Sequence, residues 1–194
     1  MKEIVVATNN QGKLKEIKEI LQGYTLRSLE EMNCHIEVLE DQDTFEGNAK
    51  KKAREISEQL HMPCIADDSG LCIDIYEGWP GIYTARFLGD NTTPIQRNEY
   101  ILEKMKNVEG QQRRARVKCC MVYYEEGQYI VGNGEIQGKI AQNRRGKNGF
   151  GFDEIFEIED GRTYAELSVE EKNQISHRRL ALQDLMDKMK KTHM

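Results

Sequence analysis

Two pairs of adjacent carboxylates are the residues of this chain best suited to chemistry. Glu40-Asp41 precede a predicted helix, and Asp67-Asp68 follow a short apolar strand. Carboxylate oxygens are hard ligands that hold Mg²⁺, and a carboxylate can also take a proton from water. Acidic pairs are equally common on solvated turns, so the pairs alone leave both interpretations open. Neighbouring residues on a strand face opposite ways, and we expect only one of Asp67 and Asp68 to enter a given site.

Two lysines lie at unusual places on their predicted helices. Lys13 falls in a first helical turn after the polar segment Thr8–Gly12, where a cation opposes the helix dipole by a few tenths to about 1 kcal/mol. A strand, a polar turn and a helix N-terminus commonly form an anion site in α/β proteins. Lys52 lies only about 20° from Phe45, on the edge of the apolar stripe of the helix predicted over 44–60. Both lysines could be solvated; the alternative is that they line a cleft that takes a polyanion.

A third group of polar residues lies near the end of the chain. The S-x-x-E pattern at 168–171 predicts the start of a helix. If that helix ran unbroken, Lys172 and His177 would point about 140° apart and could not converge. A break near Ser176 would let Lys172, His177 and Arg178 face one anion, whereas an unbroken helix would leave them solvated.

Hydrophobic patterning predicts the elements that position these groups. We expect an acidic turn over 67–70 and a hairpin around 126–127. Helices and strands alternate early and antiparallel strands follow, which favours an α/β fold with a mixed sheet. The predicted strands are 2–8, 24–28, 64–66, 71–76, 114–124 and 128–136, and the predicted helices are 13–22, 44–60, 94–107 and 169–190.

Composition narrows the class of protein. The chain has 194 residues, 38% hydrophobic and 31% charged, with a net charge of −5. The acidic balance argues against a nucleic-acid partner, and no apolar run reaches the roughly 20 residues of a membrane span. The N-terminus lacks a signal-peptide pattern, and the five cysteines include no C-x-x-C pair, so we expect reduced thiols and a cytoplasmic protein. Neither a G-x-G-x-x-G fingerprint nor a P-loop is present.

Six segments, taken in order, resemble the inosine triphosphate pyrophosphatase family, whose members hydrolyse deaminated purine nucleoside triphosphates. They are Thr8–Lys13, Glu40–Lys52, Ala66–Leu71, Gly78–Arg86, Gly149–Asp153 and Glu170–Arg178. The resemblance implies an α/β fold, with an elongated mixed β-sheet flanked by helices and two lobes around a central cleft. It also implies that residues 1–194 form one pyrophosphatase domain and that the protein works as a homodimer.

The same resemblance implies the reaction: Mg²⁺-dependent hydrolysis of ITP, dITP or XTP to the nucleoside monophosphate and pyrophosphate. It assigns Glu40 and Asp68 to Mg²⁺, with Asp68 also the water-activating base. Asp41 remains an alternative ligand if the loop shifts by one residue. The implied substrate-binding residues are Thr8, Asn10, Lys13 and Lys52 for the phosphates, Ser69 beside the nucleotide, and Phe150, Gly151, Phe152, Asp153, Lys172, His177 and Arg178 for the base.

This division of roles suits a purine with an oxygen at its 6-position. Hydrogen-bond donors such as Lys172 would pair with that oxygen and leave the amino group of adenine unsatisfied. The chain departs from the family at Phe152, where Tyr or Trp is usual, and at Glu154, where proline is frequent; both concern base preference. Two further hypotheses stay open: a nucleotide sensor without catalysis, and a pyrophosphatase for other modified nucleotides such as pyrimidine triphosphates.

Overall fold

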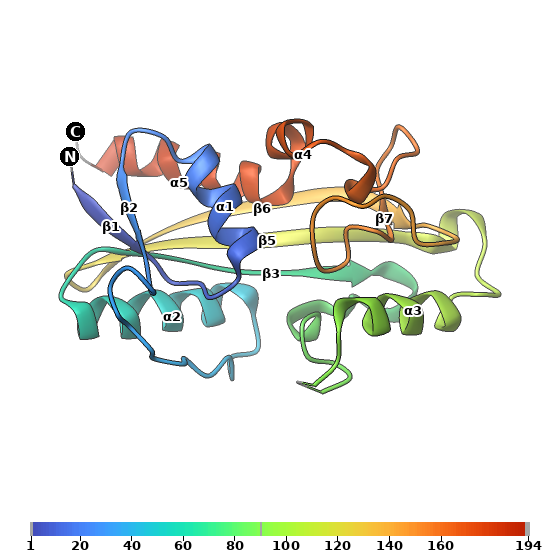
Figure 1. Cartoon of the computed structure of the whole chain (residues 1–194), viewed down its shortest axis with the longest axis horizontal. Helices are drawn as coiled ribbons and strands as arrows, with labels where there is room; N and C mark the ends of the chain where they lie inside the picture. Colours follow the sequence, from blue (N-terminus) through green and yellow to red (C-terminus); the bar gives the residue numbers. More distant parts are fainter. Residues whose placement is uncertain (1, 90, 193–194) are drawn as a thin grey trace. The chain divides into compact units, whose positions relative to one another are not determined.

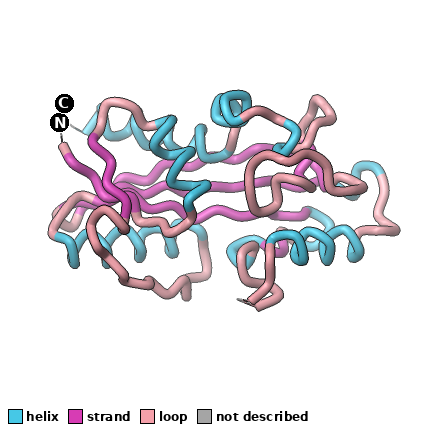
Figure 2. The backbone as a smooth tube through the Cα atoms, in the orientation of Figure 1, coloured by secondary structure: helices cyan, strands magenta, loops and turns pink. Residues whose placement is uncertain are grey.

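The structure is a computed structural model that describes residues 2–89 and 91–192. It has a mixed β-sheet with flanking helices, which confirms the predicted α/β class (Figures 1 and 2). The strands are β1 Glu3–Val6, β2 Thr25–Ser28, β3 Cys64–Ile73, β4 Trp79–Pro80, β5 Arg114–Glu125, β6 Gln128–Ile140 and β7 Phe156–Glu157. The α-helices are α1 Gln11–Ile20, α2 Phe45–Leu60, α3 Pro94–Lys104, α4 Val169–Ile175 and α5 His177–Thr192.

The chain forms two compact units, each built from separate segments. The first unit comprises Met1–Asp68, Cys119–Gly134 and His177–Met194, and the second comprises Ser69–Lys118 and Glu135–Ser176. Strands β3, β5 and β6 therefore contain residues of both units.

In the first unit, the strand order is β2-β1-β3-β5-β6, and β1 pairs in parallel with both β2 and β3. Alternate residues of β1 enter two different cores, as the pleat of a strand requires. Ile4 and Val6 pack with residues of α1 and α5, whereas Val5 and Ala7 pack with residues of α2. Helices α1 and α5 thus cover one face of this part of the sheet and α2 covers the other (Figure 1).

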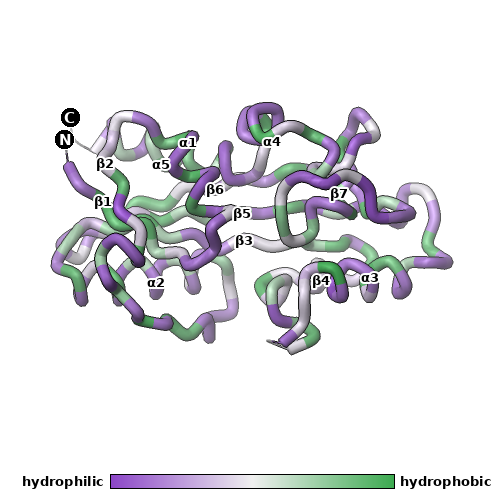
Figure 3. Tube along the Cα trace, viewed as in Figure 1, coloured by the Kyte–Doolittle hydropathy of each residue, from purple (hydrophilic) through white to green (hydrophobic). Residues whose placement is uncertain are grey.

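The helices of the first unit are amphipathic. Figure 3 shows hydrophilic and hydrophobic residues alternating along them. In α1, Leu14, Ile17 and Ile20 are buried at helical spacing. Both α1 and α2 begin at a side-chain cap: Asn10 accepts from the backbone N–H of Lys13, and Thr44 from that of Gly47.

Strand β3 corrects the sequence prediction. The acidic turn expected over 67–70 is wrong, because β3 runs unbroken from Cys64 to Ile73 through both aspartates. Nine of its ten residues are buried. Polar side chains and a glycine are turn signals, but here one oxygen of each carboxylate has a partner from a distant part of the chain: Lys13 for Asp67 and Asn48 for Asp68. Tertiary contacts therefore override the local preference.

In the second unit, the strand order is β3-β5-β6-β7, and the short strand β4 pairs antiparallel with β3. Its core includes Leu71, Ile101 of α3, Val117 and Phe156. Arg113 is 3% exposed, and its guanidinium donates to four backbone carbonyls, those of Met105, Val108, Ile140 and Ala141. Such a buried cation fixes three chain segments at once.

The chain's last helical region has the break that one of the two sequence hypotheses placed near Ser176, but Lys172 and Arg178 pair with different carboxylates, Asp153 for the first and Glu16 and Asp67 for the second. Helix α4 ends at Ile175, Ser176 has extended backbone angles, and α5 starts at His177. Ser176 closes the second unit and His177 begins the final segment of the first. Within the described residues, no helix has the length and apolar character needed to cross a bilayer. All five cysteines are buried free thiols.

Candidate active site

Asp67 and Asp68 lie on opposite faces of β3, as alternation along the strand predicts. Asp67 Oδ2 lies 3.0 Å from Lys13 Nζ of α1, on the face that carries α1 and α5. Asp68 Oδ2 accepts a hydrogen bond of 2.9 Å from Asn48 Nδ2 of α2, on the other face. The two carboxylates are therefore held by different helices, although they are neighbours in sequence.

Asp67 belongs to a buried row of alternating charges. Its Oδ2 lies 3.2 Å from Arg178 Nη2, and the other guanidinium nitrogen Nη1 of Arg178 pairs with Glu16 of α1. Arg178, Asp67 and Glu16 are 1%, 1% and 6% exposed. Truncating one member of this row would leave an uncompensated buried charge, so such a change should strongly destabilise the fold.

The two aspartates differ in their electrostatic surroundings. Burial alone would raise the pKa of Asp67, but the charges of Lys13 and Arg178 hold its pKa well below the usual range. Burial raises the pKa of Asp68 to about 6; Lys52 opposes the rise and the charge of Glu40 adds to it. Asp67 is thus a fixed anion, whereas Asp68 is poised to exchange a proton near neutral pH.

Glu40 and Lys52 bring the loop before α2 to these aspartates. Lys52 Nζ lies 2.6 Å from Glu40 Oε1. Burial alone would lower the pKa of Lys52, but Asp67, Glu40 and Asp68 raise it overall. Lys52 is therefore surrounded by carboxylates and does not extend into solvent as a snorkelling lysine would.

Glu40 and Asp41 are neighbours in the chain, but their carboxylates pair with different lysines, Lys52 and Lys51. Asp41 is exposed and pairs with Lys51 at 2.8 Å, away from the charges that act on Asp68. Asn48 fixes this arrangement, because its Oδ1 accepts from the backbone N–H of Gln42 while its Nδ2 donates to Asp68. The loop register therefore favours Glu40 as the carboxylate beside Asp68.

The turn between β1 and α1 uses its polar side chains locally. Thr8 Oγ1 accepts from the backbone N–H of Asn10, and Asn10 Oδ1 accepts from that of Lys13. These bonds shape the N-terminus of α1 next to the ammonium of Lys13. The turn can present backbone and side-chain groups to an anion, as the sequence predicted for Thr8, Asn10 and Lys13.

The second unit gathers a separate polar cluster. Lys172 Nζ of α4 lies 2.6 Å from Asp153 Oδ2, and the two side chains are almost fully buried. The same Oδ2 accepts from the backbone N–H of Phe150 at 2.7 Å. The Lys172 nitrogen also lies 4.6 Å from the centre of the Phe150 ring.

The other residues predicted to bind the substrate are Ser69, Gly151, Phe152 and His177. Gly151 has a φ of +64°, and its carbonyl accepts from Asn98 Nδ2 at 2.9 Å. The ring of Phe152 meets that of Phe156 edge to face, with centroids 6.5 Å apart, on the core of the unit. Ser69 follows Asp68 in β3 and is half-buried, and His177 is buried at the start of α5.

Comparison with known proteins decides the family. The Ham1 family model matches residues 4–188 of the chain. The chain belongs to the Ham1 family. It is 43% identical over 189 residues to a dITP/XTP pyrophosphatase of Bacillus subtilis (strain 168), covering 95% of this chain and 96% of the relative. It is 42% identical over 200 residues to a dITP/XTP pyrophosphatase of Clostridium perfringens, covering 98% of both chains.

Solved structures of Ham1 proteins share this fold. The Staphylococcus aureus Ham1 protein has a TM-score of 0.87 and 38% identity, covering 98% of this chain and all of that one. A HAM1 protein from Coxiella burnetii also has a TM-score of 0.87, with 36% identity, covering 98% of this chain and all of that one. The recognised sequence motifs and the fold therefore agree.

The carboxylates of this Ham1-family protein fit a divalent cation. Burial is the main cause of the raised pKa of Asp68, and the negative charge of Glu40 adds to it; a bound cation would offset that repulsion. Asp67 Oδ1 is buried with no hydrogen-bond partner among the described residues. Those residues contain no cluster of three or more acidic, His or Cys side chains arranged for a metal. Two carboxylates completed by substrate phosphates are the usual arrangement for Mg²⁺.

Three residues of this Ham1-family site escaped the sequence analysis: Glu16, Asn48 and Asn98. Each is a buried polar residue inside an amphipathic helix. A buried position for a polar side chain signals a specific partner, since an unsatisfied group would be costly. Helical periodicity could have indicated that Asn48 of α2 is buried, because it lies near the apolar stripe of that helix. It could not have identified Asp68 as the partner of Asn48.

Proposed function

We propose that this protein is a pyrophosphatase that hydrolyses the deaminated purine nucleoside triphosphates ITP, dITP and XTP to the monophosphate and pyrophosphate, and so cleanses the nucleotide pool. The observation that carries the proposal is the first-unit cluster of Asp68, Glu40, Lys13 and Lys52, in which carboxylates and lysines alternate. Relatives named dITP/XTP pyrophosphatases match almost the whole chain.

In this proposal, water attacks the triphosphate and the anhydride bond between its α- and β-phosphates breaks, so that pyrophosphate leaves. The carboxylate of Asp68 takes the proton from the attacking water, as a general base. Lys13 and Lys52 bind phosphate oxygens and neutralise the charge that develops on the leaving group. Asp67 and Asn48 act indirectly, because they hold Lys13 and Asp68 in place.

We assign the metal to Mg²⁺, with Glu40 and Asp68 as its protein ligands. When bound, Mg²⁺ would polarise the phosphates and lower the pKa of water. The hard oxygen donors and the small number of carboxylates support this choice over a softer metal.

We assign base selection to the second-unit cluster around Lys172. Its ammonium can donate to the 6-oxygen of hypoxanthine or xanthine, and the Phe150 ring offers a stacking face beside it. Asp153 fixes the direction of the ammonium. Adenine presents an amino donor at the same position, which would face the Lys172 ammonium and stay unpaired.

The test is pyrophosphate release from ITP, XTP, dITP, ATP, GTP and dUTP, each with and without Mg²⁺. Turnover confined to the inosine and xanthosine nucleotides and dependent on Mg²⁺ is expected. Turnover of dUTP or the common nucleotides would retain the metal site and reject the base assignment. Binding without release would make the protein a nucleotide sensor.

The proposal extends to the whole chain as one catalytic domain, because β3, β5 and β6 contain residues of both units. The homodimer and the cytoplasmic location implied by the sequence stay predictions. Sedimentation at two protein concentrations would check the first of these.

A further inference from the structure

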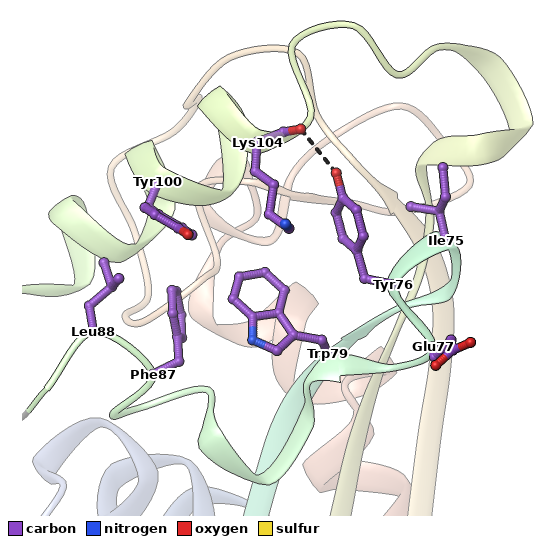
Figure 4. Close-up of a pocket in the computed structure, with 8 residues that line it drawn as sticks. All are labelled: Ile75, Tyr76, Glu77, Trp79, Phe87, Leu88, Tyr100 and Lys104. Carbon is purple, nitrogen blue, oxygen red and sulfur yellow. Dashed lines mark hydrogen bonds between the residues drawn. The ribbon is translucent and has the colours of Figure 1, made fainter.

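A cavity in the second unit contains no residue of either functional cluster. Its volume is about 450 Å³, within the range of small-molecule sites. Four aromatic side chains dominate its walls: Tyr76, Trp79, Phe87 and Tyr100 (Figure 4). Trp79 lies at their centre, with ring centroids 4.8 Å from Phe87, 6.1 Å from Tyr76 and 6.2 Å from Tyr100. The rings meet edge to face or tilted, so they do not stack on one another in parallel.

One cation points into this aromatic cavity. Lys104 Nζ, at the end of α3, lies 4.5 Å from the centre of the Tyr76 ring and 5.7 Å from that of Trp79. Figure 4 shows the amine directed into the space among the rings. The hydroxyl of Tyr76 donates to the backbone carbonyl of Lys104 at 2.9 Å, which ties the ring to the helix end. Lys104 has no carboxylate partner among the residues that the structure describes.

One carboxylate also lines the cavity but does not neutralise the amine. Glu77 forms no ion pair with Lys104, and in Figure 4 it lies at the opposite end of the cavity beside Ile75. A ligand at the Lys104 end therefore meets a positive charge set among π faces. The ring faces hold the ammonium in position. Unlike a carboxylate counter-ion, they do not cancel its charge.

We propose that this cavity is a second ligand site, which takes a flat aromatic ring carrying one anionic group. The ring would stack among Trp79, Phe87 and Tyr100, and the anion would pair with Lys104. Tyr100 is 46% exposed, so the cavity is reachable from solvent. The anion can be a carboxylate or a phosphate, because both accept hydrogen bonds from an ammonium.

The cavity contains its own reporter. Trp79 is the single tryptophan of the chain, so intrinsic tryptophan fluorescence comes from this site alone. We would titrate the full-length protein, without nucleotide or Mg²⁺, with trans-cinnamate, its neutral amide cinnamamide, and phenyl phosphate. Saturable quenching by cinnamate with weak or no quenching by cinnamamide is expected. A response to phenyl phosphate as well would extend the ligand class to phosphates.

Lys104→Met removes the charge and keeps most of the stem. We expect it to weaken cinnamate binding about tenfold and to leave cinnamamide unchanged. Lys106→Met is the matched control, because Lys106 is exposed, lies two residues away and pairs with Glu103. Far-UV circular dichroism of both variants checks the fold.

Several results would overturn the proposal. Equal quenching by cinnamate and cinnamamide would remove the role of charge, and equal losses in the two lysine variants would remove the role of Lys104. Absence of any saturable quenching would mean that the cavity takes no such ligand. A Trp79 signal that changes with protein concentration alone, and not with the probes, would mean that a second copy of the chain covers the rings.

Discussion

Asp67 and Asp68 are neighbours in the chain, but the pKa of Asp67 is lowered and that of Asp68 is raised. Ionised Asp68 therefore destabilises the folded protein when no metal is bound. Its pKa of about 6 exceeds the value of about 3.9 in an unfolded chain, so the folded state binds more protons between these values. Stability of the metal-free protein should therefore fall as pH rises from about 4 to about 6, by up to about 3 kcal/mol. The lost stability stays absent above that window.

Asp68→Asn should remove this pH dependence and abolish turnover together. We expect the variant to exceed the metal-free wild type in stability near pH 8 and to match it near pH 4, since the amide cannot ionise. Pyrophosphate release should fall at least about a hundredfold. Chemical denaturation at both pH values, with Asp41→Asn as the exposed control, measures the effect. Near-normal turnover in the variant would remove Asp68 from the proposed mechanism.

Lys172 and Asp153 call for a paired experiment, because each is buried against the other. Lys172→Met should destabilise the protein by about 3–5 kcal/mol, since it strands a buried carboxylate. Adding Asp153→Asn should recover much of that loss, and a double-mutant cycle gives the coupling. If Lys172 selects the base, the double variant should still lose discrimination between ITP and ATP. Equal losses on both nucleotides would place Lys172 on the phosphates instead.

At the scale of elements, β6 approaches α5 too closely for any side chain at two positions. A Cβ on Gly134 would lie 2.0 Å from the carbonyl oxygen of His177, and one on Gly132 would lie 2.2 Å from that of Ala181. Both obstacles are backbone atoms, so a change of rotamer cannot relieve the clash. Because Gly132 and Gly134 have no side chains, the start of α5, with His177 and Arg178, can pack directly against the backbone of β6.

Gly134→Ala should push α5 outward at its first turn. We expect a loss of about 1–3 kcal/mol in the free energy of unfolding and a drop in turnover, because Arg178 would shift from Asp67. Thermal unfolding and pyrophosphate release measure the two effects. Gln137→Ala, on an exposed position of the same strand, is the control. A variant with wild-type stability and activity would show that the helix accommodates the methyl group without moving.

Most elements were predictable because their signals are local. The apolar stripes of α1 and α2 and the hairpin between β5 and β6 with its Glu126-Gly127 turn agree with the structure. For residues 169–190 the sequence left a continuous and a broken helix open, and the structure has the break at Ser176. The continuity of β3 could not be predicted from the sequence, since residues 67–70 include turn-forming residues. Its strand is sustained by Lys13 and Arg178, far away in sequence.

The candidate site also has residues that could be predicted from the sequence and residues that could not. Residue types and motifs pointed to Glu40, Lys52 and Asp68, whose contacts the structure provides. The partners Glu16 and Asn48 could not be foreseen, because a pairing such as Arg178 with Glu16 spans 162 residues. Only the folded chain brings such groups together.

At the scale of the whole molecule, the two compact units have their own cores, yet three strands belong to both. Whether they unfold together is a question of cooperativity. Shared strands favour a single transition, since β3, β5 and β6 each have backbone in both units.

The five buried thiols can be used to test whether the two units unfold together. Cys72 lies in the second unit, whereas Cys34, Cys64, Cys119 and Cys120 lie in the first. Burial raises the pKa of Cys120 to about 12 and also raises that of Cys72, so neither thiol should alkylate in the folded state. Under mild denaturant, mass spectrometry of iodoacetamide-treated protein would count the modified cysteines. Molecules carrying either no label or five labels indicate one cooperative opening; a population labelled only at Cys72 would reveal a unit that opens alone.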